Sequence, residues 1–114
     1  MITCKTLCNE CPFSCNSSKG WLAHYTVMDF KDFMNNEILF PCHKLVTVDM
    51  SLIEASELIQ QGKLRLCRGY VESMIKSCKL PKNLEFQKVI NQIKVEELSY
   101  KSMAIWDFTT HHNE

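Results

Sequence analysis

The sequence predicts a small, mainly α-helical single domain with short β segments, organised by a four-cysteine metal site. Apolar residues recur at steps of three and four in several stretches, which is the spacing of one buried helical face. Seven cysteines occur among 114 residues, an unusually high number. This length is also the commonest size for one domain, so we expect residues 1–114 to form a single metal-binding unit.

Composition excludes several classes of protein. Hydrophobic residues make up 46% of the chain and charged residues 23%, which is ordinary for a globular domain and argues against disorder. Thirteen Lys and Arg balance thirteen Asp and Glu, so the net charge gives no support for nonspecific binding to nucleic acid or anionic membranes. No apolar run reaches the ~18 residues that span a bilayer, and the first residues lack the pattern of a signal peptide. We therefore expect a cytoplasmic protein without membrane contact.

Charge is unevenly spread along the chain. Residues 20–60 carry two basic and six acidic groups, residues 61–94 eight basic and two acidic groups, and residues 95–114 one basic and four acidic groups. The basic stretch is either a helix surface that faces acidic neighbours within the fold or a surface for a nucleic acid or an acidic partner. The sequence favours the first interpretation.

The first third of the chain predicts a loop and then a helix. Residues 1–19 are dense in cysteine and contain turn-forming residues, which indicates a loop. Ser17 or Ser18 then caps a helix whose apolar positions fall between residues 21 and 34. A break near residues 26–29, giving two short helices, is the alternative.

The middle of the chain predicts extended structure followed by a helix. Residues 37–43 are expected to be extended, because Pro41 disfavours the helical conformation of the residue before it. β-branched residues predict a short strand over residues 45–48. A capping-box pattern opens a helix over residues 51–59, and Gly62 is placed to end it.

The last part of the chain predicts two more helices and a strand. Apolar spacing indicates amphipathic helices over residues 70–78 and 84–93, the first ending before Pro81. Residues 103–108 are expected to form a short strand. Residues 111–114 are expected to fray.

The cysteines predict a shared metal centre. Cys8 and Cys11 form a C-x-x-C motif, the spacing that lets two thiolates from one turn bind one metal centre. The other two ligands are expected to be Cys42 and Cys67, because each lies in a loop or helix start beside bulky apolar residues. Cys78 falls on the apolar face of a predicted helix, where a buried core thiol is expected.

Two cysteines, Cys4 and Cys15, receive no role from the sequence. The spacing Cys4-x3-Cys8-x2-Cys11 also matches the cysteine triad of radical-SAM enzymes. Those enzymes need most of a barrel, and this chain has neither the length nor the alternation of strands and helices. We therefore set that interpretation aside.

Four motifs follow one another along residues 8–70: Cys8-x2-Cys11-Pro12, Ser18-x-Gly20-Trp21, Phe40-x-Cys42-His43 and Cys67-Arg68-Gly69-Tyr70. Their order resembles an uncharacterised family of small cysteine-rich phage and bacterial proteins with the motifs CxxCP, SGxW, FxCH and CRGW. This sequence departs from the family's motifs at two positions. The family has an arginine after CxxCPx where this chain has Ser14, and a final tryptophan where this chain has Tyr70. The resemblance implies a site at the motif cysteines and, for a phage-encoded protein, action in the host cytoplasm. It implies no reaction.

Two kinds of metal group suit this arrangement. Structural zinc sites usually join two chelating pairs, whereas a C-x-x-C-P followed by separate single cysteines is typical of a four-thiolate cradle for a [4Fe–4S] cluster. The ligand order also resembles that of iron–sulfur uracil-DNA glycosylases. The pattern therefore favours a [4Fe–4S] cluster slightly over Zn²⁺.

Two further residues are expected beside the centre. His43 follows Cys42 directly, so it either supports the ligands through a hydrogen bond or replaces Cys42 on a zinc ion. Arg68 follows Cys67, and its guanidinium is expected to point at one of three groups: the metal centre, a bound anion or a carboxylate of residues 29–37. For Arg68 the sequence favours a structural ion pair.

The motifs favour a binding or regulatory module that acts on a protein partner, with a metal that organises the fold. HExxH, GxSxG and glycine-rich phosphate loops are absent from the sequence, and only three glycines occur. Two alternatives remain: a redox-active or metal-dependent enzyme that uses a Cys8 or Cys11 thiolate, and a nucleic-acid-binding protein that uses the basic segment 63–94. Burial of a large indole is favourable, so Trp21 is expected to lie in the core beside the ligand loops.

Overall fold

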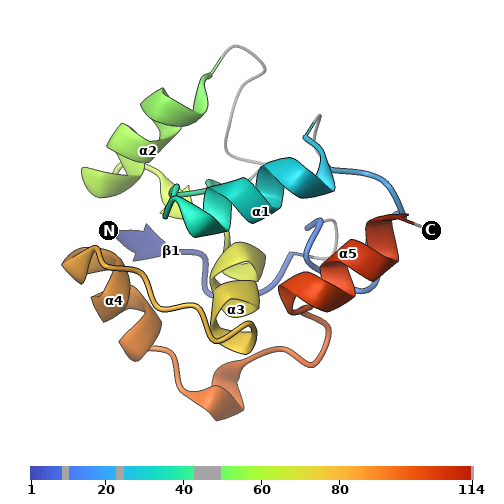
Figure 1. Ribbon diagram of the computed structural model, residues 1–114. Helices are drawn as coiled ribbons and strands as arrows, with labels where there is room; N and C mark the ends of the chain where they lie inside the picture. Colours follow the sequence, from blue (N-terminus) through green and yellow to red (C-terminus); the bar gives the residue numbers. More distant parts are fainter. Residues whose placement is uncertain (9–10, 23–24, 43–49, 114) are drawn as a thin grey trace.

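The computed structural model describes residues 1–8, 11–22, 25–42 and 50–113, and within these ranges the chain is mainly helical, as predicted (Figure 1). It also has one short sheet, whose two strands lie where no strand was predicted. The elements are β1 (Ile2–Thr3), α1 (Val27–Asn35), α2 (Leu52–Gln60), β2 (Arg65–Leu66), α3 (Arg68–Lys76), α4 (Leu84–Asn91), the 3₁₀-helix η2 (Val95–Glu97) and α5 (Ile105–Asn113). None of the helices in the described ranges is long and apolar enough to cross a membrane.

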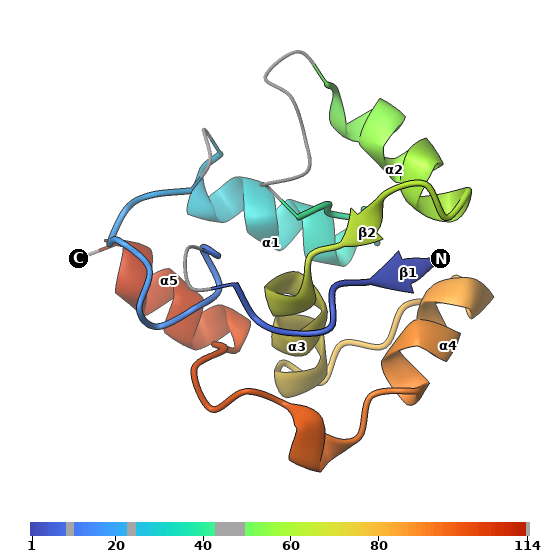
Figure 2. The same cartoon turned by 180° about the vertical axis from the view of Figure 1, so that it is seen from behind.

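Helix α3 lies at the centre of the molecule. Helices α1 and α5 pack against each other on one side of it, and α4 lies on the other side (Figures 1 and 2). Helix α2 lies at the edge of the molecule, and the two short strands run beside each other near the start of α3 (Figure 2). The cysteine-rich N-terminal segment therefore runs past the N-terminal end of the central helix.

Aromatic rings fill the space between α1, α3 and α5. Phe13, from the cysteine-rich loop, stacks on Phe108 of α5 with ring centroids 4.5 Å apart and meets Phe30 of α1 edge-on at 5.3 Å. The ring of Tyr70 in α3 lies 5.7 Å from that of Phe13, and its hydroxyl donates to the carbonyl of Ile38. All four rings are fully buried. Because buried aromatic rings contribute much of the apolar area of a core, Phe13 fixes the loop to the helices.

Three predicted helices are confirmed as α2, α3 and α4, with ends within two residues of those expected. Ser51 caps α2 by accepting a hydrogen bond from the backbone N–H of Glu54 at 3.1 Å. Pro41 lies in non-helical backbone and bridges to Leu66 of β2, in agreement with the predicted extended segment. The strand predicted over residues 45–48 lies outside the described residues.

Helices α1, α2 and α3 end in the same way, with a left-handed residue just after the C-cap. After α2 this residue is Gly62, as predicted, with φ +75° and its N–H bonded to the carbonyl of Ile59. After α1 and α3 the same position holds Glu37 (φ +56°) and Cys78 (φ +58°). The prediction that Cys78 lies buried on a helix face was wrong, because this turn carries its side chain to the surface.

The first helix begins later than predicted. Thr26 and Asp29 form a reciprocal capping box, in which each side-chain oxygen accepts the other residue's backbone N–H, at 3.1 and 2.9 Å. Ser17 and Ser18 lie in turns instead, and Gly20 adopts φ +80°, which an α-helix does not accept. The helix boundary therefore lies at the break named as the alternative.

The prediction that Trp21 is largely buried was wrong. Its side chain is 41% exposed. The prediction depended on a continuous helical face from residue 18 onward, and that segment is a turn, so no such face exists to carry the indole inward.

The predictions for the C-terminus were also wrong. Instead of a strand over 103–108 and a frayed end, residues 105–113 form α5. His112 in its last turn is buried and donates from Nε2 to the carbonyl of Pro12 at 2.7 Å, while Nδ1 accepts the backbone N–H of Gly20 at 3.0 Å. These contacts join residues about a hundred positions apart, and no local pattern encodes them.

Two residues of the basic stretch, Arg68 and Lys76, are used inside the fold. Arg68 forms a buried ion pair with Glu72 one turn later, with Nε 2.6 Å from the carboxylate. The carboxylate of Glu72 also accepts the N–H of Ser99 and the hydroxyl of Ser102. Lys76 donates to the carbonyls of the same two serines. The charged side of α3 therefore holds the segment between η2 and α5 in place.

Candidate metal centre

The short sheet places three cysteines on one face. Strands β1 and β2 are parallel, with Thr3 beside Leu66. Cys4 and Cys67, the next residue of each strand, therefore lie beside each other. The N–H of Cys4 donates to the carbonyl of Leu66 at 3.0 Å. On the other side of β2, the antiparallel bridge between Pro41 and Leu66 places Cys42 next to Arg65, whose carbonyl accepts the N–H of Cys42 at 3.3 Å.

The pleat of the sheet directs these cysteines to one face. Side chains alternate along a strand, so Cys67 and Arg65 point to the face opposite Leu66. The registers on either side of β2 put Cys4 and Cys42 on that same face.

A fourth cysteine reaches this region from the C-x-x-C loop. The Sγ atoms of Cys11 and Cys67 lie 3.4 Å apart, and both residues are buried. Cys11 approaches over the first turn of α3, at Gly69. A Cβ atom at Gly69 would overlap the Cys11 sulfur and would lie only 3.0 Å from side-chain atoms of Leu7 and Phe13. The glycine is therefore what allows the sulfur to lie against the helix.

The electrostatic surroundings act on these thiols in opposite directions. Burial, together with the neighbouring thiols of Cys42 and Cys67, raises the pKa of Cys4 to about 11, against the lowering effect of Arg65. The hydrogen bond that Cys67 shares with Cys11 raises the pKa of Cys67, and so does its burial. The backbone N–H groups of Gly69 and Tyr70, at the start of α3, favour its thiolate. The thiols of Cys4 and Cys67 are thus neutral at pH 7, next to groups that stabilise thiolates.

Three of the four predicted ligands, Cys11, Cys42 and Cys67, lie near the short sheet and the start of α3. The fourth, Cys8, is half-buried against the hydrophobic core, and its carbonyl accepts the N–H of Cys11 at 3.1 Å. The seven cysteines are free thiols, and Cys15 is exposed.

The two supporting residues have different outcomes. His43, predicted to support or replace Cys42, lies outside the described residues. Arg68 forms the predicted ion pair, but its partner is Glu72 on its own helix and not a carboxylate of residues 29–37. Its guanidinium also donates to the carbonyl of Glu97 at 3.3 Å. These contacts direct Arg68 toward η2.

Cys4 is the residue of this region that the sequence did not assign. Its signal is weak, because a two-residue strand carries no detectable periodicity. Each of the two short strands is followed by a cysteine, Cys4 after β1 and Cys67 after β2. Only the parallel register of the strands shows that these two cysteines are neighbours.

The geometry falls short of a formed metal site. Among the described residues, no three His, Cys, Asp or Glu side chains converge closely enough to hold a metal ion as they stand. The sulfurs of Cys11 and Cys67 are in contact, and the register of the strands places Cys4 and Cys42 on the same face as Cys67. The donor chemistry suits zinc or an iron–sulfur cluster, since thiolates are the preferred ligands of both.

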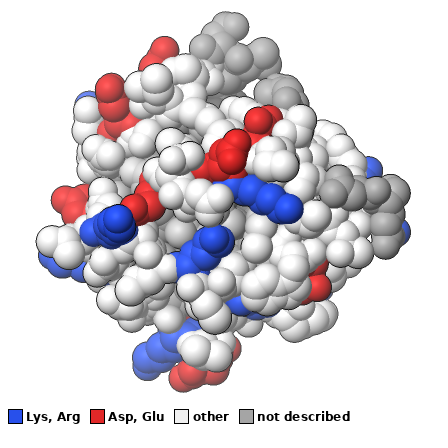
Figure 3. Space-filling model, viewed as in Figure 1, with Lys and Arg blue, Asp and Glu red and all other residues white. Residues whose placement is uncertain are grey.

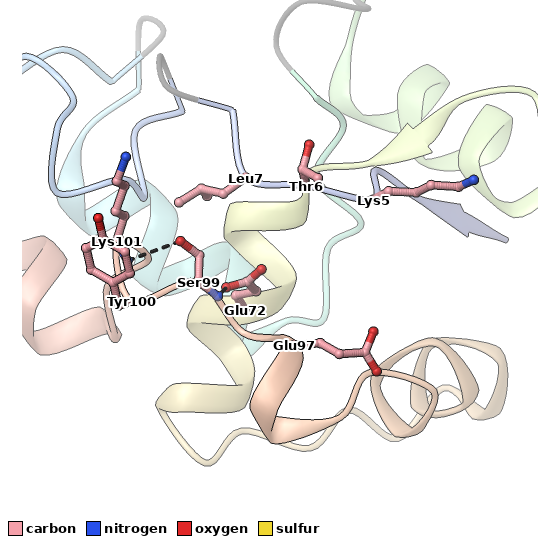
Figure 4. A pocket seen from close by; sticks show the side chains of 8 residues that line it. All are labelled: Lys5, Thr6, Leu7, Glu72, Glu97, Ser99, Tyr100 and Lys101. Carbon is pink, nitrogen blue, oxygen red and sulfur yellow. Dashed lines mark hydrogen bonds between the residues drawn. The ribbon is translucent and has the colours of Figure 1, made fainter.

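A shallow pocket lies beside α3, with a volume of about 350 Å³ (Figure 4). It is lined by Lys5, Thr6, Leu7, Glu72, Glu97, Ser99, Tyr100 and Lys101. The side chains of Lys5 and Lys101 extend to opposite sides of the view, and the Glu72 carboxylate is occupied by internal hydrogen bonds (Figure 4). The pocket therefore lacks converging charges for an ionic ligand.

Basic and acidic side chains are mixed on the face shown in Figure 3. This face does not present the single-sign surface that contacts to nucleic-acid phosphates require. Comparison of the chain with protein-family models, with curated proteins and with solved structures gave no match. The candidate function therefore depends on the site itself.

Proposed function

We propose that the protein is a small metal-binding module that works in the cytoplasm and acts on a protein partner. The observation that carries the proposal is the contact between the sulfurs of Cys11 and Cys67, 3.4 Å apart, on a sheet whose register places Cys4 and Cys42 on the same face as Cys67. Three of these four residues were predicted as ligands: Cys11 from the C-x-x-C spacing, and Cys42 and Cys67 from their places in loops or helix starts beside apolar residues.

The position of the thiols supports a role in organising the fold. They belong to the N-terminal strand, the C-x-x-C loop, the extended segment before residue 43 and the start of the central helix α3. A metal group bound to cysteines of all four would close long chain loops and so stabilise the folded state, as a crosslink does. In this role the metal stabilises the domain and takes no part in a reaction.

The surface supports a protein as the partner. Ile53 of α2 is 75% exposed, and it lines a mainly apolar groove with Ile38 and Leu52. Exposed apolar side chains grouped in this way are typical of interaction sites. Ile53 lies on α2 at the edge of the molecule, so a partner can reach it without disturbing the cysteines (Figure 1).

The decisive experiment is metal analysis of protein purified without oxygen. We expect bound zinc or iron in a fixed ratio to the chain, retained through gel filtration, and lost when Cys11 and Cys67 are both replaced by serine. The Cys15→Ser variant is the matched control, because Cys15 is exposed, and it should keep the full metal content. Wild-type protein that is folded and free of metal would refute the proposed function.

A further inference from the structure

We infer that the apolar groove along α2 binds a basic amphipathic helix of the partner protein. An aliphatic side chain of that helix enters the groove, and its Lys or Arg side chains lie against Glu54 and Glu57. This inference rests on the part of the proposed function that gives the module a protein partner, and it specifies the chemistry of that partner. It depends neither on the cysteines nor on a metal.

The first step concerns the shape of the groove. It has a volume of about 190 Å³ and almost entirely apolar walls, and its lining residues are Ile38, Leu52, Ile53, Ser56 and Glu57. Four of them lie one turn apart in pairs on α2, Leu52 with Ser56 and Ile53 with Glu57, so they form one continuous face of the helix. Ile38, from the segment after α1, completes the wall. The space suits one bulky aliphatic side chain.

The second step concerns the apolar area that the groove exposes to water. Ile53 is 75% exposed, and Leu52 and Ile38 are only half-buried. A single exposed apolar side chain is common on protein surfaces, but here three surround one concavity. A partner that fills the groove would remove all three from water at once, which is favourable. This apolar contact supplies the anchor of the complex.

The third step concerns charge. Glu57 lines the groove, and Glu54, three residues earlier on the same helix, is exposed beside it. Neither carboxylate forms an ion pair with a residue of the described ranges, and α2 itself contains no basic residue. Acidic side chains gather over α2 at the upper left of Figure 3. The carboxylates therefore attract a basic partner and repel nucleic-acid phosphates and anionic lipid headgroups.

The fourth step concerns how a partner's backbone can lie in the groove. One wall is a helix, and the backbone of Ile38 is already bonded inside the fold. Its N–H donates to the carbonyl of Phe33, and its carbonyl accepts the hydroxyl of Tyr70, each at 2.9 Å. The lining residues therefore offer no strand edge for an added strand. Recognition through side chains favours a helix packed along α2.

The test uses two synthetic helical peptides of equal length with leucines at identical positions. One peptide has lysine at the positions that flank the leucine stripe, and the other has glutamate there. Binding to the full chain, purified without oxygen, is measured by fluorescence anisotropy. We expect the lysine peptide to bind about tenfold or more tightly than the glutamate peptide. Its affinity should fall as the salt concentration rises, because the charged contacts are exposed.

A matched pair of variants tests the apolar anchor. Ile53→Ser should weaken binding of the lysine peptide about tenfold or more, as loss of a central apolar contact does. Val95→Ser is the control, because Val95 is 78% exposed but lies on η2, outside the groove. It should bind the peptide as wild type does.

A second matched pair tests the charges. The double variant Glu54→Gln/Glu57→Gln should bind the lysine peptide more weakly than wild type and with a smaller dependence on salt. The double variant Glu96→Gln/Asp107→Asn removes the same number of exposed negative charges from η2 and α5. It should keep the affinity and the salt dependence of wild type.

A further measurement locates the peptide on the wild-type protein. The chain is labelled with nitrogen-15 and titrated with the lysine peptide, and amide chemical shifts are followed. We expect the changes to concentrate on α2 and Ile38. This measurement does not depend on the folding of a variant.

The outcomes separate this inference from metal binding. Equal affinity for the two peptides, binding of neither, or shift changes away from α2 would each overturn it and leave the metal content as it is. Self-association of wild type through α2, seen by sedimentation and by concentration-dependent shifts, would assign the groove to a second copy and overturn it too. Metal-free protein that binds the lysine peptide at α2 would refute the metal-binding function and support this inference.

Discussion

At the scale of single residues, the identity of residue 69 is decided by a neighbour that is remote in sequence. Gly69 lies in the first turn of α3, where alanine would normally be favoured by about 1 kcal/mol. The sulfur of Cys11 occupies the space that a Cβ would need. A local preference for alanine is therefore reversed by a contact across fifty-eight positions of the chain.

We expect Gly69→Ala to destabilise the protein by about 1–3 kcal/mol, the usual cost of overpacking a core. Chemical denaturation followed by circular dichroism measures this change. Ser73→Ala on the same helix is the control with the opposite sign, because the buried hydroxyl of Ser73 has no hydrogen-bond partner in the described part of the chain. Equal or higher stability of Gly69→Ala would show that the sulfur does not lie against this turn.

His112 makes the stability of the fold depend on pH. Burial lowers the pKa of His112 below its ordinary value of 6.5, although its hydrogen bond to Pro12 acts in the opposite direction. Protonation at Nδ1 would also lose the hydrogen bond from the N–H of Gly20, since two donors would then face each other. The unfolded chain therefore takes up the proton first.

It follows that stability should fall as the pH drops through about 6.5 toward the lower pKa of the folded state, by at most about 1.4 kcal/mol per pH unit from this group. Urea unfolding at pH 7.5 and pH 5.5 tests this in wild type and in His112→Gln. The variant should be less stable at pH 7.5 but should lose less stability on acidification. An identical pH dependence in both proteins would exclude His112 as the cause.

At the scale of elements, short local motifs set where the helices start and end, and the residues at these positions differ in how well they suit the backbone conformation. The capping box of Thr26 and Asp29 begins α1, and the glycine after α2 suits its left-handed position. Cys78 holds the same position after α3 without being glycine. A residue with a Cβ in this conformation costs about 1–2 kcal/mol relative to glycine.

Replacing Cys78 by glycine should therefore stabilise the protein by about 0.5–1 kcal/mol, since glycine's greater freedom in the unfolded chain offsets part of the gain. Thermal or urea unfolding in reducing buffer measures the difference. Cys78→Ser removes the thiol but keeps the strained conformation, so it should leave stability nearly unchanged. If the serine variant gains as much as the glycine variant, the thiol and not the backbone is responsible.

At the scale of the whole molecule, the N-terminal loop is held from two sides. On one side the contact between Cys11 and Cys67 joins it to the start of α3. On the other side α5 reaches back through His112 to Pro12, and the N–H of Met103 donates to the carbonyl of Phe13 at 2.9 Å. The proposed metal would complete the first of these connections.

We expect removal of the metal to cause cooperative loss of structure, because the metal's binding free energy contributes to folding. Far-ultraviolet circular dichroism during titration with a zinc chelator should show one transition, reversed by added metal. Cys15→Ser should behave as wild type does. An apo-protein with the same melting temperature as the metal-bound form would contradict a fold-organising role.

The sequence by itself determined the mainly helical class and helices α2, α3 and α4, with Gly62 at the end of α2. These features follow from periodicity and capping, which act within a few residues.

Only the tertiary structure decided the place of Cys4, the exposure of Trp21 and the helical C-terminus with its buried histidine. Two-residue strands have no periodicity, and their register is set by pairing between distant segments. Residues 105–113 become a helix because they pack on α1 and α3 and bond to the cysteine-rich loop. Such contacts have free energies comparable to local propensities, so the local pattern alone cannot predict which of them prevails.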